Sequence, residues 1–190
     1  MSVLLKLAGL VAVIVVWQLA TTVLAVPSYI LPSPSELAQG VWLDRTVILA
    51  GLVPLMIQSA LGFLFGNGLG ILLAVLVNRF ATARATVMPV ALAIRSIPIV
   101  AITPLITLLI GFGLQTTVTI ATLITFFPAF INMVRGLNAV DRQAVQLFRM
   151  MDAGEMTVFR KLRWPSAMPY LFSSLKVTAP AAILGATVAE

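Results

Sequence analysis

Side chains that could carry out chemistry are few in this chain. Of its 190 residues, 12 are Lys or Arg and 6 are Asp or Glu, and His and Cys are absent. The composition therefore excludes a Ser–His triad, a Cys nucleophile, an imidazole or thiolate metal site and a disulfide. The G-x-x-x-x-G-K-[ST] loop that cradles nucleotide phosphates is also missing. The chain therefore cannot bind ATP in the P-loop manner by itself, and any ATP that it uses is expected to be bound by a partner.

The charged side chains are densest between residues 135 and 165. Half of the basic residues and half of the acids lie there: Arg135, Arg142, Arg149, Arg160, Lys161 and Arg163, with Asp141, Asp152 and Glu155. Apolar residues recur at helical spacing, which predicts helical pieces at about 140–151 and 155–162, divided at Asp152-Ala153-Gly154. Such an amphipathic surface is typical either of a helix that docks in a partner's groove or of one that lies on a membrane. The pattern alone leaves both open.

The elements that must position this stretch are membrane helices. The chain is 61% hydrophobic and 9% charged, whereas soluble domains carry about 25% charged residues. Three charge-free runs exceed the about 20 residues that cross a bilayer as a helix. Five spans are predicted, at about 3–25, 57–78, 88–110, 116–134 and from 168 to the end. The predicted fold class is all-α, a polytopic helical membrane protein with one domain over 1–190.

The beginning of the chain has two interpretations. Lys6 followed by an apolar run fits a signal peptide, but the run is long and lacks a clear cleavage site, so a retained membrane anchor is favoured. Residues 27–56 follow as a predicted external loop. Within it, Ser35 and Glu36 before Leu37, Val41 and Trp42 predict a short, capped amphipathic helix.

Glycine and proline mark particular points of the spans. Glycines recur every fourth residue in the second span and predict one helical face on which another helix packs closely: Gly62, Gly66 and Gly70. Prolines are expected to kink the third and fourth spans, at Pro98, Pro104 and Pro128.

Orientation follows from the basic residues. Alternating the five spans places eleven of the twelve on one side, with Arg45 as the exception. The positive-inside rule then puts the N-terminus and the 135–165 loop in the cytoplasm.

Three polar residues in or near the spans are candidates for lining a transport pathway: Asn67, Arg95 and Thr103. A charge inside a span is costly and often faces a cavity, although Arg95 lies where its side chain could reach the interface. Most polar residues in spans hydrogen-bond a neighbouring helix. Interhelical packing is therefore the alternative role.

The order of motifs along the chain resembles the binding-protein-dependent ABC importer permeases, in the nitrate/sulfonate/taurine-type branch. Residues 135–165 are similar to that family's coupling loop, with the signature E-A-A-x3-G-x9-I-x-L-P. Pro165 fits its last proline, Leu162 the isoleucine and Phe159 a frequent aromatic. Other similar stretches are Leu31-Pro32-Ser33-Pro34-Ser35, Ile97-Pro98, Ala101, Pro104-Leu105, Gly111-Phe112-Gly113, Phe127-Pro128, Asn132, Gly136, Pro169, Leu175-Lys176 and Ala189-Glu190.

Two features depart from the family pattern. Counted back from Pro165, the signature glycine falls on Asp152 and the E-A-A positions fall on Gln146, Leu147 and Phe148. A glycine would permit a backbone conformation that Asp adopts less freely, so whether this loop still couples is left open. Family members usually have six spans, and the chain looks short by one at Glu190.

The resemblance implies a permease subunit of an ATP-driven importer in the cytoplasmic (inner) membrane. Such a subunit is not an enzyme, binds no cofactor directly and has no nucleic-acid partner. The implied solute is small, for example a sulfonate anion or a thiamine-precursor-like compound. Implied partners are ABC ATP-binding subunits, an external solute-binding protein and a second permease copy of the same or another kind. The implied coupling residues are Arg149, Met151, Asp152, Ala153, Gly154, Phe159, Arg160 and Pro165. The alternatives are a secondary transporter or channel, and a non-transporting membrane assembly subunit.

Overall fold

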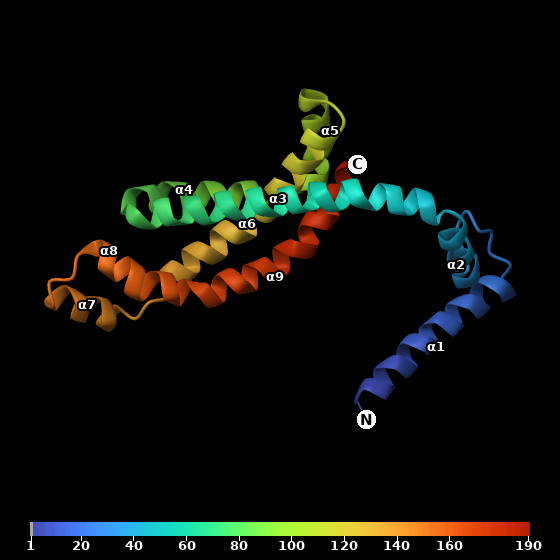
Figure 1. Ribbon diagram of the computed structural model, residues 1–190, viewed down its shortest axis with the longest axis horizontal. Helices are drawn as coiled ribbons and strands as arrows, with labels where there is room; N and C mark the ends of the chain where they lie inside the picture. Colours follow the sequence, from blue (N-terminus) through green and yellow to red (C-terminus); the bar gives the residue numbers. More distant parts are fainter. Residues whose placement is uncertain (1) are drawn as a thin grey trace. The chain divides into compact units, whose positions relative to one another are not determined.

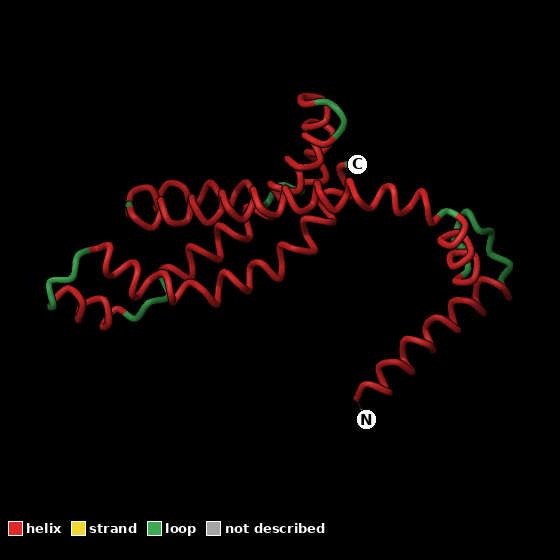
Figure 2. Tube along the Cα trace, viewed as in Figure 1, coloured by secondary structure: helices red, strands yellow, loops and turns green. Residues whose placement is uncertain are grey.

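The computed structural model describes residues 2–190, apart from the side chains of residues 2–4, 81, 95 and 100. Its elements are α1 (Ser2–Val23), α2 (Pro34–Leu43), α3 (Arg45–Arg79), α4 (Ala81–Arg95), α5 (Ile99–Ile110), α6 (Leu114–Leu137), α7 (Arg142–Met150), α8 (Glu155–Val158), the π-helix η1 (Phe159–Arg163) and α9 (Trp164–Ala189). Helices joined by short loops account for the whole described chain (Figure 2). Two compact units are present, Met1–Val53 and Pro54–Glu190. The all-α fold class is confirmed.

Four helical stretches are long and apolar enough to cross a membrane. They are Leu5–Val23, Arg45–Arg79, Leu114–Leu137 and Glu155–Ala189. Large apolar side chains are exposed along them, among them Leu64 and Leu72 of α3 and Phe172 and Leu184 of α9. Exposed apolar surface on helices whose backbone is satisfied internally suits a hydrocarbon environment. The polytopic membrane fold is confirmed, with four long spans where the sequence predicted five.

The predicted third span, 88–110, is two shorter helices. α4 ends at Arg95 and α5 begins at Ile99, with Pro98 in an extended conformation (φ −66°, ψ 116°) between them. Proline has no N–H to donate, and it disfavours helical geometry in the residue before it. The prediction of one kinked helix was therefore wrong at Pro98, whereas Pro104 does lie inside α5.

The last span begins earlier than predicted. α8, η1 and α9 form one continuous helix, Glu155–Ala189, so the piece expected at 155–162 and the span expected from 168 are a single element. In η1 the N–H of Trp164 bonds the carbonyl of Phe159, five residues back, directly before Pro165. A π-helical turn widens the helix locally, and such turns are frequent at functional sites.

In the first unit, α2 packs on α1, and the backbone N–H of Ser35 donates to Oε1 of Gln18 at 3.1 Å. The cap of α2 is Ser33 and not Ser35 as predicted, with Pro34 as the first helical residue. Proline suits that position because its missing N–H would have no helical partner there.

Ser33 and Glu36 form a capping box at the start of α2. The Ser33 N–H donates to Oε2 of Glu36 at 2.8 Å, and Oγ of Ser33 accepts from the Glu36 N–H at 3.3 Å. The Ser33 N–H, followed by the hydroxyls of Ser28 and Ser33, lowers the pKa of the Glu36 carboxyl, because these donors favour the charged form. α3 already begins at Arg45, so the loop predicted at 27–56 is largely helical.

The core of the second unit forms where α3, α6 and α9 approach one another. The predicted glycine face of α3 is confirmed: Gly62, Gly66 and Gly70 lie against Ala121, Thr125 and Ala129 of α6. A Cβ on Gly70 would lie 2.9 Å from the Ala129 Cβ, too close for two carbon atoms. α6 also packs along α9, and α7 and α8 lie together beyond one end of this pair (Figure 1).

Candidate functional site

α7 presents two distinct faces. Its N-terminus is capped by Asp141, whose side chain accepts from the Gln143 N–H at 3.0 Å. Half-buried residues line one face: Ala144, Val145 and Phe148. Apolar residues at positions i, i+3 and i+4 line another and are exposed, with Met150 at 85%: Leu147, Met150 and Met151. An exposed apolar face on a short helix of this kind can dock in a groove of another protein.

Asp152 forms the turn between α7 and α8 in a left-handed conformation, with φ +55°. Its N–H donates to the Arg149 carbonyl at 3.1 Å, and the Ala153 N–H donates to the Phe148 carbonyl at 3.0 Å. These two bonds form a Schellman motif, in which the residue at the Asp152 position is usually glycine. Asp152 therefore adopts a conformation that glycine adopts more freely, whereas Gly154 has φ −62° and needs no glycine.

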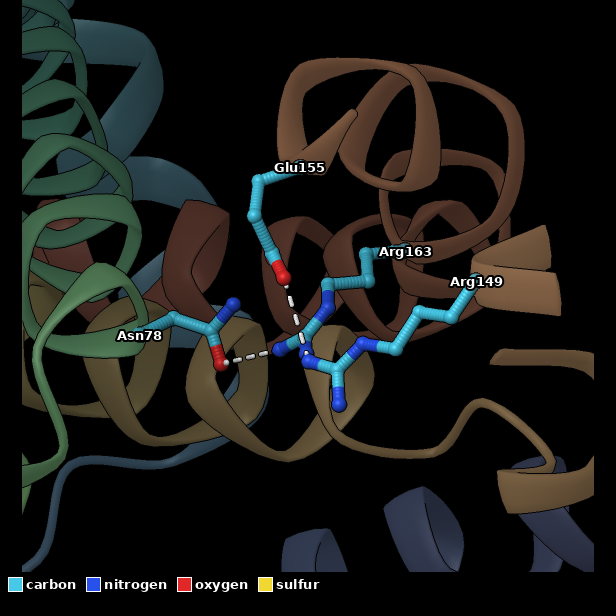
Figure 3. A network of polar contacts seen from close by, with 4 residues as sticks. All are labelled: Asn78, Arg149, Glu155 and Arg163. Atoms are coloured by element: carbon cyan, nitrogen blue, oxygen red, sulfur yellow. Dashed lines mark hydrogen bonds and ion pairs between the residues drawn. The ribbon is translucent and has the colours of Figure 1, made fainter. Parts of the chain in front are cut away.

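Two polar contacts join neighbouring elements near this turn, one between α7 and α8 and one between η1 and α3 (Figure 3). Nη2 of Arg149 and Oε1 of Glu155 form an ion pair at 3.0 Å that bridges α7 and α8, and Nη1 of Arg163 donates to Oδ1 of Asn78 on α3 at 3.3 Å. The side chains of Arg149 and Glu155 are 60% and 51% exposed, so their pair contributes about 0–1 kcal/mol.

The remaining predicted coupling residues lie on the helix that leads into the last span. The rings of Phe159 and Trp164 pack with centroids 5.9 Å apart, and both contact the core cluster around Phe130 and Met133. Arg160 and Pro165 are exposed. The helix carrying Phe159 is therefore anchored in the core, so that movement of α7 and α8 would be transmitted directly into α9.

A cleft of about 420 Å³ opens beside α7. Its lining comes from the start of α4, the end of α6, α7 and η1: Arg84, Leu137, Asn138, Val140, Arg142, Val145, Gln146, Arg149 and Arg163. Nη1 of Arg84 donates to Oδ1 of Asn138 at 2.8 Å across it. Sequence reasoning missed this arginine cleft, although the charge count had placed all four arginines on one side of the membrane.

The pathway candidates have different surroundings. Asn67 is buried; its Nδ2 donates to the Phe63 carbonyl at 2.8 Å, and its Oδ1 accepts from the Thr178 hydroxyl at 3.1 Å. Thr103 donates to the Ile99 carbonyl and lines a cavity at the end of α5. The side chain of Arg95 lies outside the described residues. Asn67 is thus an interhelical contact in this chain, and the pathway role of the three stays a prediction.

Comparison with known proteins bears on the whole arrangement. Residues 66–190 match the family described as binding-protein-dependent transport system inner membrane component. The formylaminopyrimidine transport permease protein ThiX of Halalkalibacterium halodurans is 30% identical, covering 93% of this chain and 70% of that protein. The riboflavin transport system permease protein RibX of Chloroflexus aurantiacus is 30% identical, covering 95% and 68%. The putative aliphatic sulfonates transport permease protein SsuC of Bacillus subtilis is 28% identical, covering 94% and 65%.

These matches favour the importer over the secondary transporter, channel and assembly-subunit alternatives. They extend over both long spans that flank the 135–165 stretch, and the relatives named are transport permeases. The chain therefore belongs to the binding-protein-dependent transport system inner membrane components, as a multi-pass permease subunit of an ABC importer and not an enzyme.

Proposed function

We propose that the chain couples ATP hydrolysis to solute movement through α7, the Asp152 turn and α8. The observation that carries this proposal is the exposed apolar face Leu147, Met150 and Met151 next to a turn of defined geometry. An ATP-binding subunit would receive this face in a groove. Because Glu155 begins the continuous helix that ends at Ala189, closure of the ATPases would tilt or shift a span directly.

The proposed orientation has the N-terminus and the 135–165 stretch in the cytoplasm. Two hydrogen bonds support the placement of these basic residues at the same end of the second unit: Arg84 with Asn138, and Arg163 with Asn78. They bring the end of α3, the start of α4, the end of α6 and η1 together. Basic residues gathered at one end of a helical unit favour the cytoplasmic side.

The proposed solute is a small molecule delivered by an external solute-binding protein, to a pathway formed with a second permease copy of the same or another kind. The relatives are named for formylaminopyrimidine, riboflavin and aliphatic sulfonates. A sulfonate anion and a thiamine-precursor-like pyrimidine are therefore the first candidates. Uptake by proteoliposomes that contain the assembled transporter, measured with one labelled compound of each class, tests this choice.

A charge on the apolar face tests the coupling proposal. Met150→Asp should abolish most transport and uncouple the ATPase, since a carboxylate cannot enter an apolar groove without a partner. Thr82→Asp is the matched control, because Thr82 is exposed and polar and lies in the first turn of α4, outside that face. Transport by Met150→Asp equal to that of Thr82→Asp would overturn the proposal.

A further inference from the structure

The arginine cleft concentrates positive charge at one end of the second unit. Four of the nine residues that line it are arginines, and none of the nine is an acid: Arg84, Leu137, Asn138, Val140, Arg142, Val145, Gln146, Arg149 and Arg163. They come from α4, the end of α6 and the loop after it, α7 and η1. Guanidinium groups around one cavity repel one another unless an anion lies between them.

The described contacts compensate little of this charge. Arg149 pairs with Glu155, whereas Arg84 and Arg163 donate to the neutral amides of Asn138 and Asn78. For Arg142 no side-chain hydrogen bond or ion pair occurs within the described part of the chain. The amides orient two guanidinium groups but leave their charge in place, so the cleft is suited to an oxyanion. Planar guanidinium groups match the oxygens of a phosphate with two parallel hydrogen bonds.

A second cavity adjoins the arginine cleft and shares Arg163 with it. Its volume is about 270 Å³, and half of its lining residues are apolar, Val75, Leu76, Met156 and Phe159, beside Asn78, Arg79, Glu155 and Arg163. Leu76 and Met156 are 50% and 64% exposed. Figure 3 shows Arg163 extending toward Asn78 of α3. Arg163 lines both cavities, with Arg149 in the lining of the first and Glu155 in that of the second.

Both cavities lie where long apolar helices end. Leu137 ends one candidate span, Arg79 ends another, and Glu155 begins a third. In a bilayer this is the depth of the lipid phosphates. A charged cleft joined to an apolar groove at that depth has the two halves needed to hold a phospholipid.

We propose that the arginine cleft binds the phosphate of an anionic phospholipid, with an acyl chain along the groove of Val75, Leu76, Met156 and Phe159. The bound headgroup would neutralise the arginines and hold α4, α7 and η1 in their relative positions. This site requires only that the helices span a bilayer, and it is independent of the coupling proposed above. A free phosphate would satisfy the cleft but not the groove.

Binding to the purified full chain in detergent tests the proposal, with a short-chain phosphatidylglycerol, the matching phosphatidylcholine and inorganic phosphate as three probes. We expect phosphatidylglycerol to bind most tightly. Arg142→Gln and Arg163→Gln should each weaken it roughly fivefold, from about 1 kcal/mol per basic residue near anionic lipid. Arg142 is chosen because its loss breaks no described polar contact. The matched controls are Arg135→Gln and Arg160→Gln, since these exposed arginines line neither cavity.

A substitution in the apolar groove distinguishes binding of a lipid phosphate from binding of free phosphate. Met156→Ser should weaken phosphatidylglycerol binding and leave that of inorganic phosphate unchanged. Inorganic phosphate binding as tightly as the lipid would overturn the lipid assignment. Lipid binding that Arg142→Gln and Arg163→Gln leave intact would overturn the site itself. Because no ATPase is present in the binding measurement, its outcome is separate from that of the coupling test.

Discussion

Asp152 closes α7 by donating its backbone N–H to the carbonyl of Arg149 at 3.1 Å while its own φ is +55°. The left-handed conformation costs an L-residue about 1–2 kcal/mol, less for Asp, whose short polar side chain tolerates it, and nothing for Gly. The chain thus has a left-handed turn at the position where the signature of the resembled family has glycine. This relationship makes the stability of the loop open to direct measurement.

Variants at position 152 should differ in stability according to how readily the new residue adopts a left-handed backbone conformation. We expect Asp152→Ala to be less stable than Asp152→Gly by about 1 kcal/mol, because a left-handed conformation is unfavourable for a residue with a Cβ and free of that penalty for Gly. Chemical denaturation of the full chain in detergent measures the difference. Gly154→Ala is the control and should be nearly neutral, since Gly154 has φ −62° and open space around it. Equal stability of the Ala and Gly variants at position 152 would contradict a left-handed turn.

The glycine face of α3 should tolerate no side chain. Gly70→Ala is expected to destabilise by about 1–3 kcal/mol, because the new Cβ would lie 2.9 Å from both the Ala129 Cβ and the Phe126 carbonyl oxygen. Thermal unfolding in detergent gives the comparison. Gly68→Ala on the same helix has nothing within 4 Å and should be neutral or slightly stabilising. If both variants unfold alike, α3 and α6 do not approach as described.

The buried contact between Asn67 and Thr178 can be separated from a pathway role. A double-mutant cycle with Asn67→Leu and Thr178→Val should give a coupling energy of about 0.6 kcal/mol, the average for hydrogen bonds within membranes. Asn67→Leu should lower stability and leave the ranking of transported solutes unchanged. A change in that ranking with no coupling to Thr178 would instead assign Asn67 to the pathway.

The capping box of α2 gives a pH dependence of known sign. Hydrogen bonds from Ser33 and Ser28 lower the pKa of Glu36 below its ordinary 4.5, so its contribution to helix stability is complete above pH 4.5 and is lost as the pH falls through the lowered pKa. Hydrogen exchange of the first α2 amides should accelerate in that acidic range relative to α3. Glu36→Gln should remove this pH dependence, and its persistence in the variant would exclude Glu36 as the cause.

Local signals in the sequence were sufficient for most of the fold. The uncharged run after Arg95 had to contain a turn at Gly111-Phe112-Gly113, and α6 begins directly after it at Leu114. The three prolines were ambiguous, because Pro104 and Pro128 lie inside helices while Pro98 ends one. Whether a proline breaks a helix or only kinks it depends on whether neighbouring groups donate to the carbonyl that the proline leaves without a donor. That depends on packing, which no local pattern contains.

The candidate site was only partly predictable. The division of the loop followed from apolar residues at helical spacing on either side of Asp152-Ala153-Gly154, and the structure has its turn there. The arginine cleft could not be derived, because Arg84 and Arg163 are 79 positions apart and meet only through the packing of α4, α6 and η1. The sequence predicted the N-cap of α2 at Ser35 and the structure has it at Ser33, because Ser-Pro-Ser offers two equivalent serines.

The most direct test of coupling is a crosslink from α7 to the ATP-binding subunit. The chain has no Cys, so a single Met150→Cys variant reports contact without background, and Leu108→Cys in α5 is the control, with 82% exposure. We expect Met150→Cys to crosslink to the ATPase in the assembled transporter, with a yield that changes when ATP is added, and Leu108→Cys to give none. Equal yields from both positions, or no crosslink from Met150→Cys in a transporter that still moves solute, would contradict coupling through α7.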